Sequence, residues 1–138
     1  MNYKGSCLCG TIQFEIEGEF EQFFLCHCSR CRKDSGSAHA ATLFSTTASL
    51  QWVTGENEVK IYNHLNSGHV KGFCQHCGSA VPTIQMDGVL LAVPAGSLDT
   101  SVEIKPNGHI FYAHRANWDF ELENSAKYDE LPETDNER

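Results

Sequence analysis

The stretch Cys26-His27-Cys28-Ser29-Arg30-Cys31 places three thiols within six residues, and four more cysteines form two pairs elsewhere in the chain. The pairs lie in Cys7-Leu8-Cys9-Gly10 and Cys74-Gln75-His76-Cys77-Gly78, so every cysteine is within three residues of another. Buried thiols that act only as small hydrophobic residues would be spread along the strands of a fold. Tight clusters of thiolates are typical of metal sites, and zinc is the commonest metal there.

Other uses of the seven thiols fit the pattern less well. An odd number cannot all pair as disulfides within one molecule, and a reducing cytoplasm does not favour disulfides. A thioredoxin-like redox motif belongs to a βαβ context, which this sequence lacks. A rubredoxin-like iron site would need two CxxC knuckles, whereas Cys7 and Cys9 form a CxC pair. Zinc is therefore the metal that the sequence predicts.

Seven thiols divide naturally into four and three, which predicts two zinc ions per chain. A structural zinc is closed by four protein ligands, whereas a catalytic zinc usually has three and an open position. In the first partition the closed site joins the two outer pairs, Cys7, Cys9, Cys74 and Cys77. The open site is then the middle cluster, Cys26, Cys28 and Cys31. The fourth position of that site is left to water, a histidine or a substrate, and a soft site favours a thiol or thioether.

A second partition is compatible with the spacing alone. Cys28 and Cys31 also form a CxxC pair, which could join the outer CxxC pair and leave a site of Cys7, Cys9 and Cys26. The first partition is favoured because it keeps each local loop intact. Gly10 and Gly78 each follow an outer pair, where glycine lets backbone amides turn toward the thiolates.

Between the cysteines, apolar residues recur with the period of short strands. Residues 12–17 alternate apolar and polar side chains, which is the pattern of a half-buried strand. Residues 66–68 and 86–88 resemble hairpin loops, and residues 29–35 are expected to form one helical turn. The fold class predicted is therefore all-β, a sandwich or folded sheet of short strands. The other expected strands are 20–25, 38–44, 50–53, 59–65, 69–73, 80–85, 89–95 and 109–114.

Length and charge limit the function classes. The 138 residues suit a single domain, expected over residues 1–130 and followed by an acidic, frayed tail over 131–138. Of the net charge of −8, the segment from Asp119 to Arg138 carries −6, because it holds eight acids and two bases. No basic surface is available for nucleic acid, and no apolar run is long enough to span a membrane. We expect a cytoplasmic protein without nucleic-acid or membrane partners.

The cysteine motifs in their order resemble the glutathione-dependent formaldehyde-activating enzyme family, which also includes centromere protein V. The matching motifs are Gly5-Ser6-Cys7-Leu8-Cys9-Gly10, Cys26-His27-Cys28-Ser29-Arg30-Cys31-Arg32 and Phe73-Cys74-Gln75-His76-Cys77-Gly78-Ser79. Gly96-Ser97-Leu98-Asp99, His109-Ile110 and Trp118 look like the carboxyl-terminal half of the family, so the resemblance runs from about Tyr3 to Trp118.

The resemblance implies a β-tent, an all-β fold of folded sheets of short antiparallel strands, stapled by two zinc ions. By position, the structural site corresponds to Cys7, Cys9, Cys74 and Cys77. The catalytic site corresponds to Cys26, Cys28 and Cys31. The implied reaction joins formaldehyde to the thiol of glutathione and gives S-hydroxymethylglutathione. Its reverse cleaves a carbon–sulfur bond, so the implied enzyme class is a carbon–sulfur lyase. The implied partners are therefore a small-molecule thiol, such as glutathione, and a small aldehyde.

Proton transfer in such a reaction needs a group that titrates near neutrality, and His27, His39 and His109 are the candidates. Arg30 and Arg32 are candidates to receive the carboxylates of glutathione or to balance thiolate charge. The tryptophans and the pair Phe23 and Phe24 are expected in the core. A zinc-stapled β-tent binding module without catalysis is the alternative function, but such a module has no reason to keep a zinc held by only three cysteines.

Overall fold

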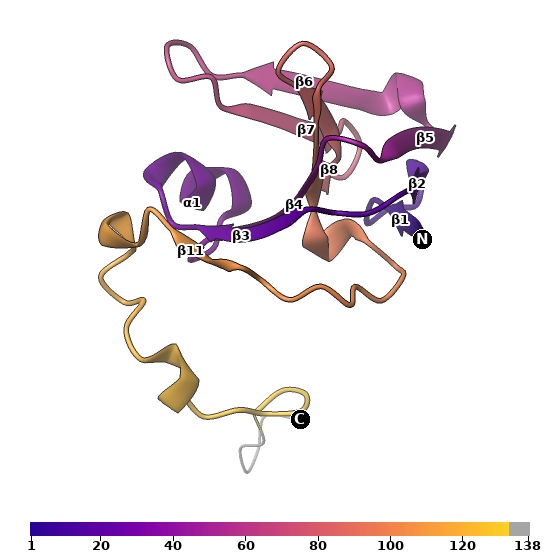
Figure 1. Ribbon diagram of the computed structural model, residues 1–138. Helices are drawn as coiled ribbons and strands as arrows, with labels where there is room; N and C mark the ends of the chain where they lie inside the picture. The colour runs from indigo at the N-terminus through magenta and orange to yellow at the C-terminus, as the bar shows by residue number, and fades with distance from the viewer. Residues whose placement is uncertain (133–138) are drawn as a thin grey trace.

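Short strands are the main regular secondary structure of residues 1–132, the part of the chain that this computed structural model describes (Figure 1). They form three sheets, with strand orders β1-β2-β5, β11-β3-β4-β10-β9 and β6-β7-β8. The predicted all-β fold class, a β-tent of small folded sheets, is confirmed. The strands are β1 (Asn2–Ser6), β2 (Gln13–Glu17), β3 (Gln22–Cys26), β4 (Ala40–Ser45), β5 (Ser49–Thr54), β6 (Val59–Asn63), β7 (Val70–Cys74), β8 (Ala80–Val81), β9 (Thr83–Gln85), β10 (Leu90–Pro94) and β11 (Gly108–Ile110).

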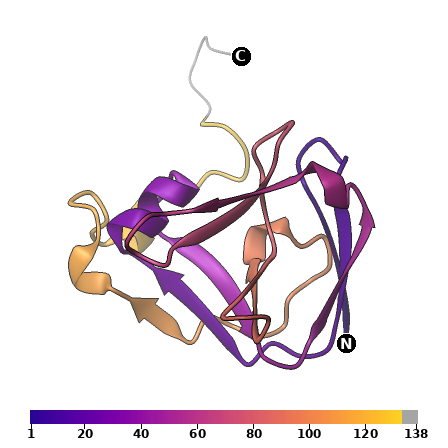
Figure 2. The ribbon, with the colours of Figure 1, turned by 90° about the horizontal axis from the view of Figure 1, so that it is seen from above.

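The first sheet follows from the alternation of side chains. In β2, Phe14 and Ile16 are buried while the residues between and beside them are exposed, because successive side chains point to opposite faces of a strand. β1, which the sequence did not predict, pairs with β2 in antiparallel register and buries Tyr3. Figures 1 and 2 show this sheet on the opposite side of the molecule from the helix α1 (Ser29–Ser35).

The helix α1 begins directly after the loop that follows β3. Cys28 is its N-cap, with an extended backbone and a sulfur that accepts a hydrogen bond from the amide of Cys31. The helix ends at Gly36, whose φ of 66° is left-handed. The single turn expected at residues 29–35 is thus a helix of seven residues, which contains Cys31 and has Cys28 as its N-cap.

The two predicted hairpins are present, since β6 pairs with β7 and β9 pairs with β10 in antiparallel register. The strand expected at 80–85 is broken at Pro82, which has no amide to donate, so β8 and β9 belong to different sheets. The strand expected at 109–114 ends at Ile110, because Phe111 takes a φ of 53° and the short 3-10 helix Tyr112–His114 follows. β11 also pairs with β3 in parallel register, unlike the antiparallel sheets that were expected.

The core lies between the sheets and contains Cys7 and Cys74 as well as aliphatic and aromatic side chains. Trp52 packs edge-on against Phe14, with ring centroids 5.9 Å apart, as expected of a core residue. Trp118 is 58% exposed, so its expected place in the core is wrong. The other buried residues of the core are Tyr3, Ile12, Ile16, Phe20, Phe23, Leu43, Val81, Leu91 and Val93.

The carboxyl-terminal segment runs below the sheets after β11 (Figure 1). The 3-10 helix Leu122–Asn124 is its last regular element within the described residues. The prediction of a frayed tail over 131–138 falls mostly on residues outside those described. None of the helices in residues 1–132 is long and apolar enough to cross a membrane.

Candidate metal centres

The loop after β1 and the turn after β7 bring four sulfurs together. The Sγ atoms of Cys7, Cys9, Cys74 and Cys77 all lie within 4.8 Å of one another. Sγ of Cys9 is 3.6 Å from Sγ of Cys7 and 3.9 Å from Sγ of Cys74. Four sulfurs placed tetrahedrally at the usual zinc–sulfur distance would be about 3.8 Å apart. The spacing of the donors therefore fits a zinc ion, and the four sulfurs group as in the first partition.

Two glycines shape the turns that present these sulfurs. Gly10 and Gly78 have φ values of 80° and 76°, which a residue with a Cβ adopts only with strain. Their amides donate to the carbonyls of Cys7 and Cys74 at 3.0 and 2.8 Å and close each turn. The amide of Leu8 donates to Ser79 Oγ at 2.9 Å and so links the two turns directly.

Hydrogen bonds and burial shift the pKa values of the thiols in this cluster in opposite directions. Hydrogen bonds with the hydroxyl and amide of Ser79 lower the pKa of Cys77 to about 5, and those with Thr11 lower the pKa of Cys9. Burial raises the pKa of Cys74 to about 11. The hydrogen bonds thus favour the thiolate form at Cys77 and Cys9, whereas burial disfavours it at Cys74. The four sulfurs together could form the donor set of a closed metal site.

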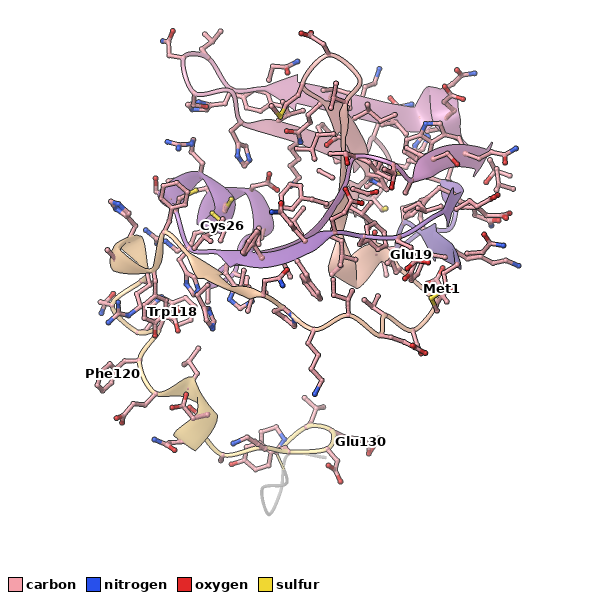
Figure 3. The ribbon with its side chains drawn as sticks, in the orientation of Figure 1. Met1, Glu19, Cys26, Trp118, Phe120 and Glu130 are labelled. Atoms are coloured by element: carbon pink, nitrogen blue, oxygen red, sulfur yellow. The ribbon has the colours of Figure 1, made fainter. Side chains whose placement is uncertain are left out.

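The second cluster lies where β3 meets α1. The Sγ atoms of Cys26, Cys28 and Cys31 lie within 4.8 Å of one another, and Figure 3 shows Cys26 beside the helix. Burial raises the pKa of Cys26 and of Cys31. Burial is the largest single influence on the Cys28 pKa and acts in the same direction, but hydrogen bonds with the amides of Cys31 and Arg30 and with the two neighbouring thiols together outweigh it. The Cys28 pKa is therefore below its usual value. Within residues 1–132 the cluster contains three donors, so an ion held there would have room for a further ligand.

A cavity of about 370 Å³ adjoins this cluster. Cys31 and His39 line it, and β4, β7 and β10 supply many of the other lining residues. Its lining is mainly small or apolar, and the charged side chains in it are those of Asp34 and Lys71. Volumes of this order suit small-molecule ligands. The three-sulfur cluster therefore faces a space that a small substrate could occupy.

Asp34 is the centre of a polar group in this cavity that the sequence analysis did not identify. Its Oδ2 lies 2.6 Å from His69 Nε2, and its Oδ1 lies 3.4 Å from Lys71 Nζ. Lys71 Nζ also donates to the backbone carbonyl of Asp34 at 2.7 Å. No short motif connects these residues, because they come from α1, from the loop before β7 and from β7 itself.

The three histidines named from the sequence come together behind the second cluster. The ring centroid of His27 lies 5.2 Å from that of His39 and 5.0 Å from that of His109. His27 Nε2 is 2.8 Å from His109 Nδ1, and His27 Nδ1 is 2.9 Å from Asp119 Oδ2. Burial lowers the pKa of His39, and its histidine neighbours lower it further.

Sequence reasoning missed Asp119 and Tyr112, whose ring centroid is 5.1 Å from that of His27. Asp119 is the first residue of the acidic carboxyl-terminal segment, yet it is only 8% exposed. Neither Arg30 nor Arg32 lines the cavity, so the arginines are not placed to receive a carboxylate inside it. Lys71 is the cationic residue of the cavity instead.

The fold and the site together define a class of protein. It is a small all-β domain with two cysteine clusters that could hold metal ions, and a cysteine of the second cluster lines a cavity. Residues 2–114 match the glutathione-dependent formaldehyde-activating enzyme family. Since the match spans most of the chain, the protein belongs to this family.

Comparison with solved structures agrees with the fold. A crystal structure of a Rhodobacter sphaeroides protein superposes with a TM-score of 0.57 and is 24% identical, covering 77% of this chain and 98% of that chain. This likeness concerns the fold alone. No significant match was found among curated proteins.

Proposed function

We propose that the protein is a zinc-dependent enzyme that joins a thiol, glutathione or a similar one, to formaldehyde or another small aldehyde. In the reverse direction it would cleave the carbon–sulfur bond, which places it among the carbon–sulfur lyases. The family to which the chain belongs is described by glutathione and formaldehyde. The observation that carries the proposal is that Cys31, one of three clustered thiols, lines a cavity of about 370 Å³.

Each cysteine cluster has its own part in this proposal. The closed site, Cys7, Cys9, Cys74 and Cys77, would hold a structural zinc that joins the first sheet to β7. Cys26, Cys28 and Cys31 would hold the second zinc. That ion would supply Lewis acidity and one free position for a soft donor.

The cavity would hold the rest of the thiol substrate. Small and apolar side chains line most of it, so it can exclude water around the reacting sulfur. Lys71 is a cationic residue of this lining. Its ammonium group has three N–H donors, so after its contacts with Asp34 it can still donate a hydrogen bond to a substrate carboxylate. A thiol with a carboxylate is therefore the substrate class that we expect.

Cobalt substitution tests whether the second cluster takes a thiol. In protein with cobalt at both sites, glutathione should strengthen the thiolate-to-cobalt charge-transfer absorption, because a fourth sulfur would complete the open site. Cys28→Ser is the control, since it removes one ligand of the open site and none of the closed site. An unchanged spectrum in the unmodified protein would contradict glutathione binding at this cluster.

A second measurement tests the reaction itself. NMR exchange spectroscopy reports how fast free glutathione and formaldehyde interconvert with their adduct, and the protein should accelerate that exchange. The uncatalysed reaction is quick, so the acceleration must be compared with that of the Cys28→Ser protein. Equal rates with the two proteins would argue against the enzyme and in favour of a non-catalytic zinc-stapled binding module.

A further inference from the structure

The pair formed by His69 and Asp34 lies in the cavity but outside both cysteine clusters and outside the group around His27. His69 Nε2 and Asp34 Oδ2 are 2.6 Å apart, and each side chain is about one-fifth exposed, at 20% and 19%. Lys71 holds the other side of the same carboxylate, with Nζ 3.4 Å from Oδ1. Asp34, His69 and Lys71 thus form one polar group, and all three residues line the cavity.

We propose that His69 is the general acid–base residue of the thiol–aldehyde reaction and that Asp34 is its positioning residue, an inference that rests on the function proposed above. A carboxylate at one ring nitrogen of a histidine accepts the proton of that nitrogen, which fixes the tautomer. With Nε2–H donating to Asp34, Nδ1 carries the lone pair. Nδ1 has no hydrogen-bond partner within residues 1–132, and His69 is one of the residues that line the cavity.

The position of the pair relative to the cysteines supports this role. Asp34 follows Cys31 by three residues on α1, and side chains at that spacing lie on the same side of a helix about 5–6 Å apart. Cys31, Asp34 and His69 also line the same cavity. A substrate in this cavity would thus have both Cys31 and His69 in the surrounding wall.

His39 is the other histidine in the cavity lining and is the less suitable base. Its ring is packed against His27 at 5.2 Å, and no carboxylate of the described residues lies within ion-pair distance of it. A base without such a partner does not have its tautomer fixed. In His69 the contact with Asp34 fixes the tautomer.

The proton movements of the step balance without any further reactant. Nδ1 of His69 takes the proton of the substrate thiol, and the sulfur uses its electron pair to form a bond to the carbonyl carbon of the aldehyde. The π electrons of the carbonyl move to its oxygen, which then takes the proton from Nδ1. In the reverse direction His69 removes the hydroxyl proton, the carbon–sulfur bond breaks, and the sulfur regains its proton.

Substitution of His69 tests the assignment in the zinc-loaded protein. General acid–base groups contribute about a hundredfold or more, so His69→Gln should lower the catalysed adduct exchange by about that factor. Zinc content and the cobalt response to glutathione should match those of the unmodified protein. His64→Gln is the matched control, because His64 is an exposed residue on the same hairpin, where its Nδ1 contacts Ser67. Added imidazole should partly restore the rate of His69→Ala.

A measurement that does not depend on activity tests the role of Asp34. Long-range ¹H–¹⁵N correlation of the free protein should show the His69 proton on Nε2, and Asp34→Asn should alter that tautomer and lower the rate. Asp34→Glu, which keeps the carboxylate, should restore part of the Nε2–H tautomer population and part of the rate. A proton found on Nδ1, or a rate for His69→Gln equal to that of the unmodified active protein, would overturn the assignment. Failure of the proposed function has a different signature, because the unmodified protein would then be no faster than Cys28→Ser.

Discussion

His27 shows how much one residue can decide in a small site. It lies between two cysteines of the second cluster and is 1% exposed, so its ring could not remain there without polar partners. His109 meets one ring nitrogen at 2.8 Å and Asp119 meets the other at 2.9 Å. The ring thereby ties β11 and the carboxyl-terminal segment to the loop that carries the cysteines.

The first prediction concerns this ring. Asp119→Ala should lower the free energy of unfolding by about 1–3 kcal/mol, because it removes the carboxylate that lies 2.9 Å from Nδ1 of the buried His27 ring. Urea unfolding of the zinc-loaded protein measures the difference. Asp129→Ala, at an exposed position on the same segment, is the control and should have little effect. Equal stability of the two variants would mean that the contact with His27 contributes nothing.

At the scale of elements, the turn between β4 and β5 is organised by a side chain from outside it. The Glu21 carboxylate accepts hydrogen bonds from the amide and hydroxyl of Thr46, at 2.8 and 2.6 Å, and from the hydroxyl of Ser45 at 2.8 Å. Those of Thr46 contribute most to a Glu21 pKa below its usual value. This carboxylate therefore favours the folded state only while it is ionised.

The second prediction follows from the direction of that shift. A carboxyl whose pKa is lower in the folded state gives its full stabilisation above its unfolded pKa and loses it as the pH falls through the folded value. Because Glu21 is exposed, its contribution is small, and Glu21→Gln should lower the melting temperature at pH 7 by only about 2 °C. The difference should shrink below about pH 4.

Thermal unfolding of both proteins across this pH range tests the prediction. Acid also releases metal from thiolates, so the quantity to follow is the difference between the two proteins at each pH. Glu17→Gln on β2 is the control, since no side-chain hydrogen bond reaches Glu17 within the described residues. A Glu21→Gln difference that stays constant down to pH 3 would contradict the assigned role of the carboxylate.

At the scale of the whole molecule, the two clusters differ in what they connect. The four-sulfur cluster joins the end of β1 to the end of β7, which belong to different sheets. The three-sulfur cluster lies within one loop and the first turn of α1. An ion in the first would hold the tertiary structure together, whereas an ion in the second would order only a local segment.

The third prediction is that two zinc ions bind with unequal lability. Graded chelation should remove about one equivalent early while the far-ultraviolet circular dichroism stays unchanged, because the local site is open and the other is closed. Elemental analysis before and after each step gives the count. A single tightly held ion from the start would contradict the division into four and three.

The fourth prediction separates the clusters by mutation. Cys74→Ser should lower the melting temperature by roughly 10 °C or more, since it breaks the connection between two sheets at a buried position. Cys28→Ser should change it by no more than about 3 °C and should remove the second metal and any activity. If both variants unfold alike, the assignment of a structural and a catalytic cluster is wrong.

The local features of this protein follow from its sequence because they depend on near neighbours in the chain. The alternation in β2, the two hairpins and the turns that end at Gly10 and Gly78 are set within a few residues, so the all-β fold could be predicted. The clustering of thiols in two outer pairs and one middle group is equally local. The expected strands 80–85 and 109–114 were wrong in their extent, because one breaks at Pro82 and the other ends before Phe111. Where a strand breaks depends on the strands with which each part pairs, and these are distant in the sequence.

Only the tertiary structure decided which residues share a site. Spacing allowed two groupings of the thiols, and the contact between the loop after β1 and the turn after β7 brings the sulfurs together as in one of them. His27 and His109 are 82 residues apart in sequence, and His69 and Asp34 are 35 apart. Contacts of this kind arise when burial of the core brings distant segments together, and the polar side chains then pair because water has been excluded from them. For that reason Asp119 looks in the sequence like one more acid of a charged segment, yet in the fold it is the partner of a buried histidine.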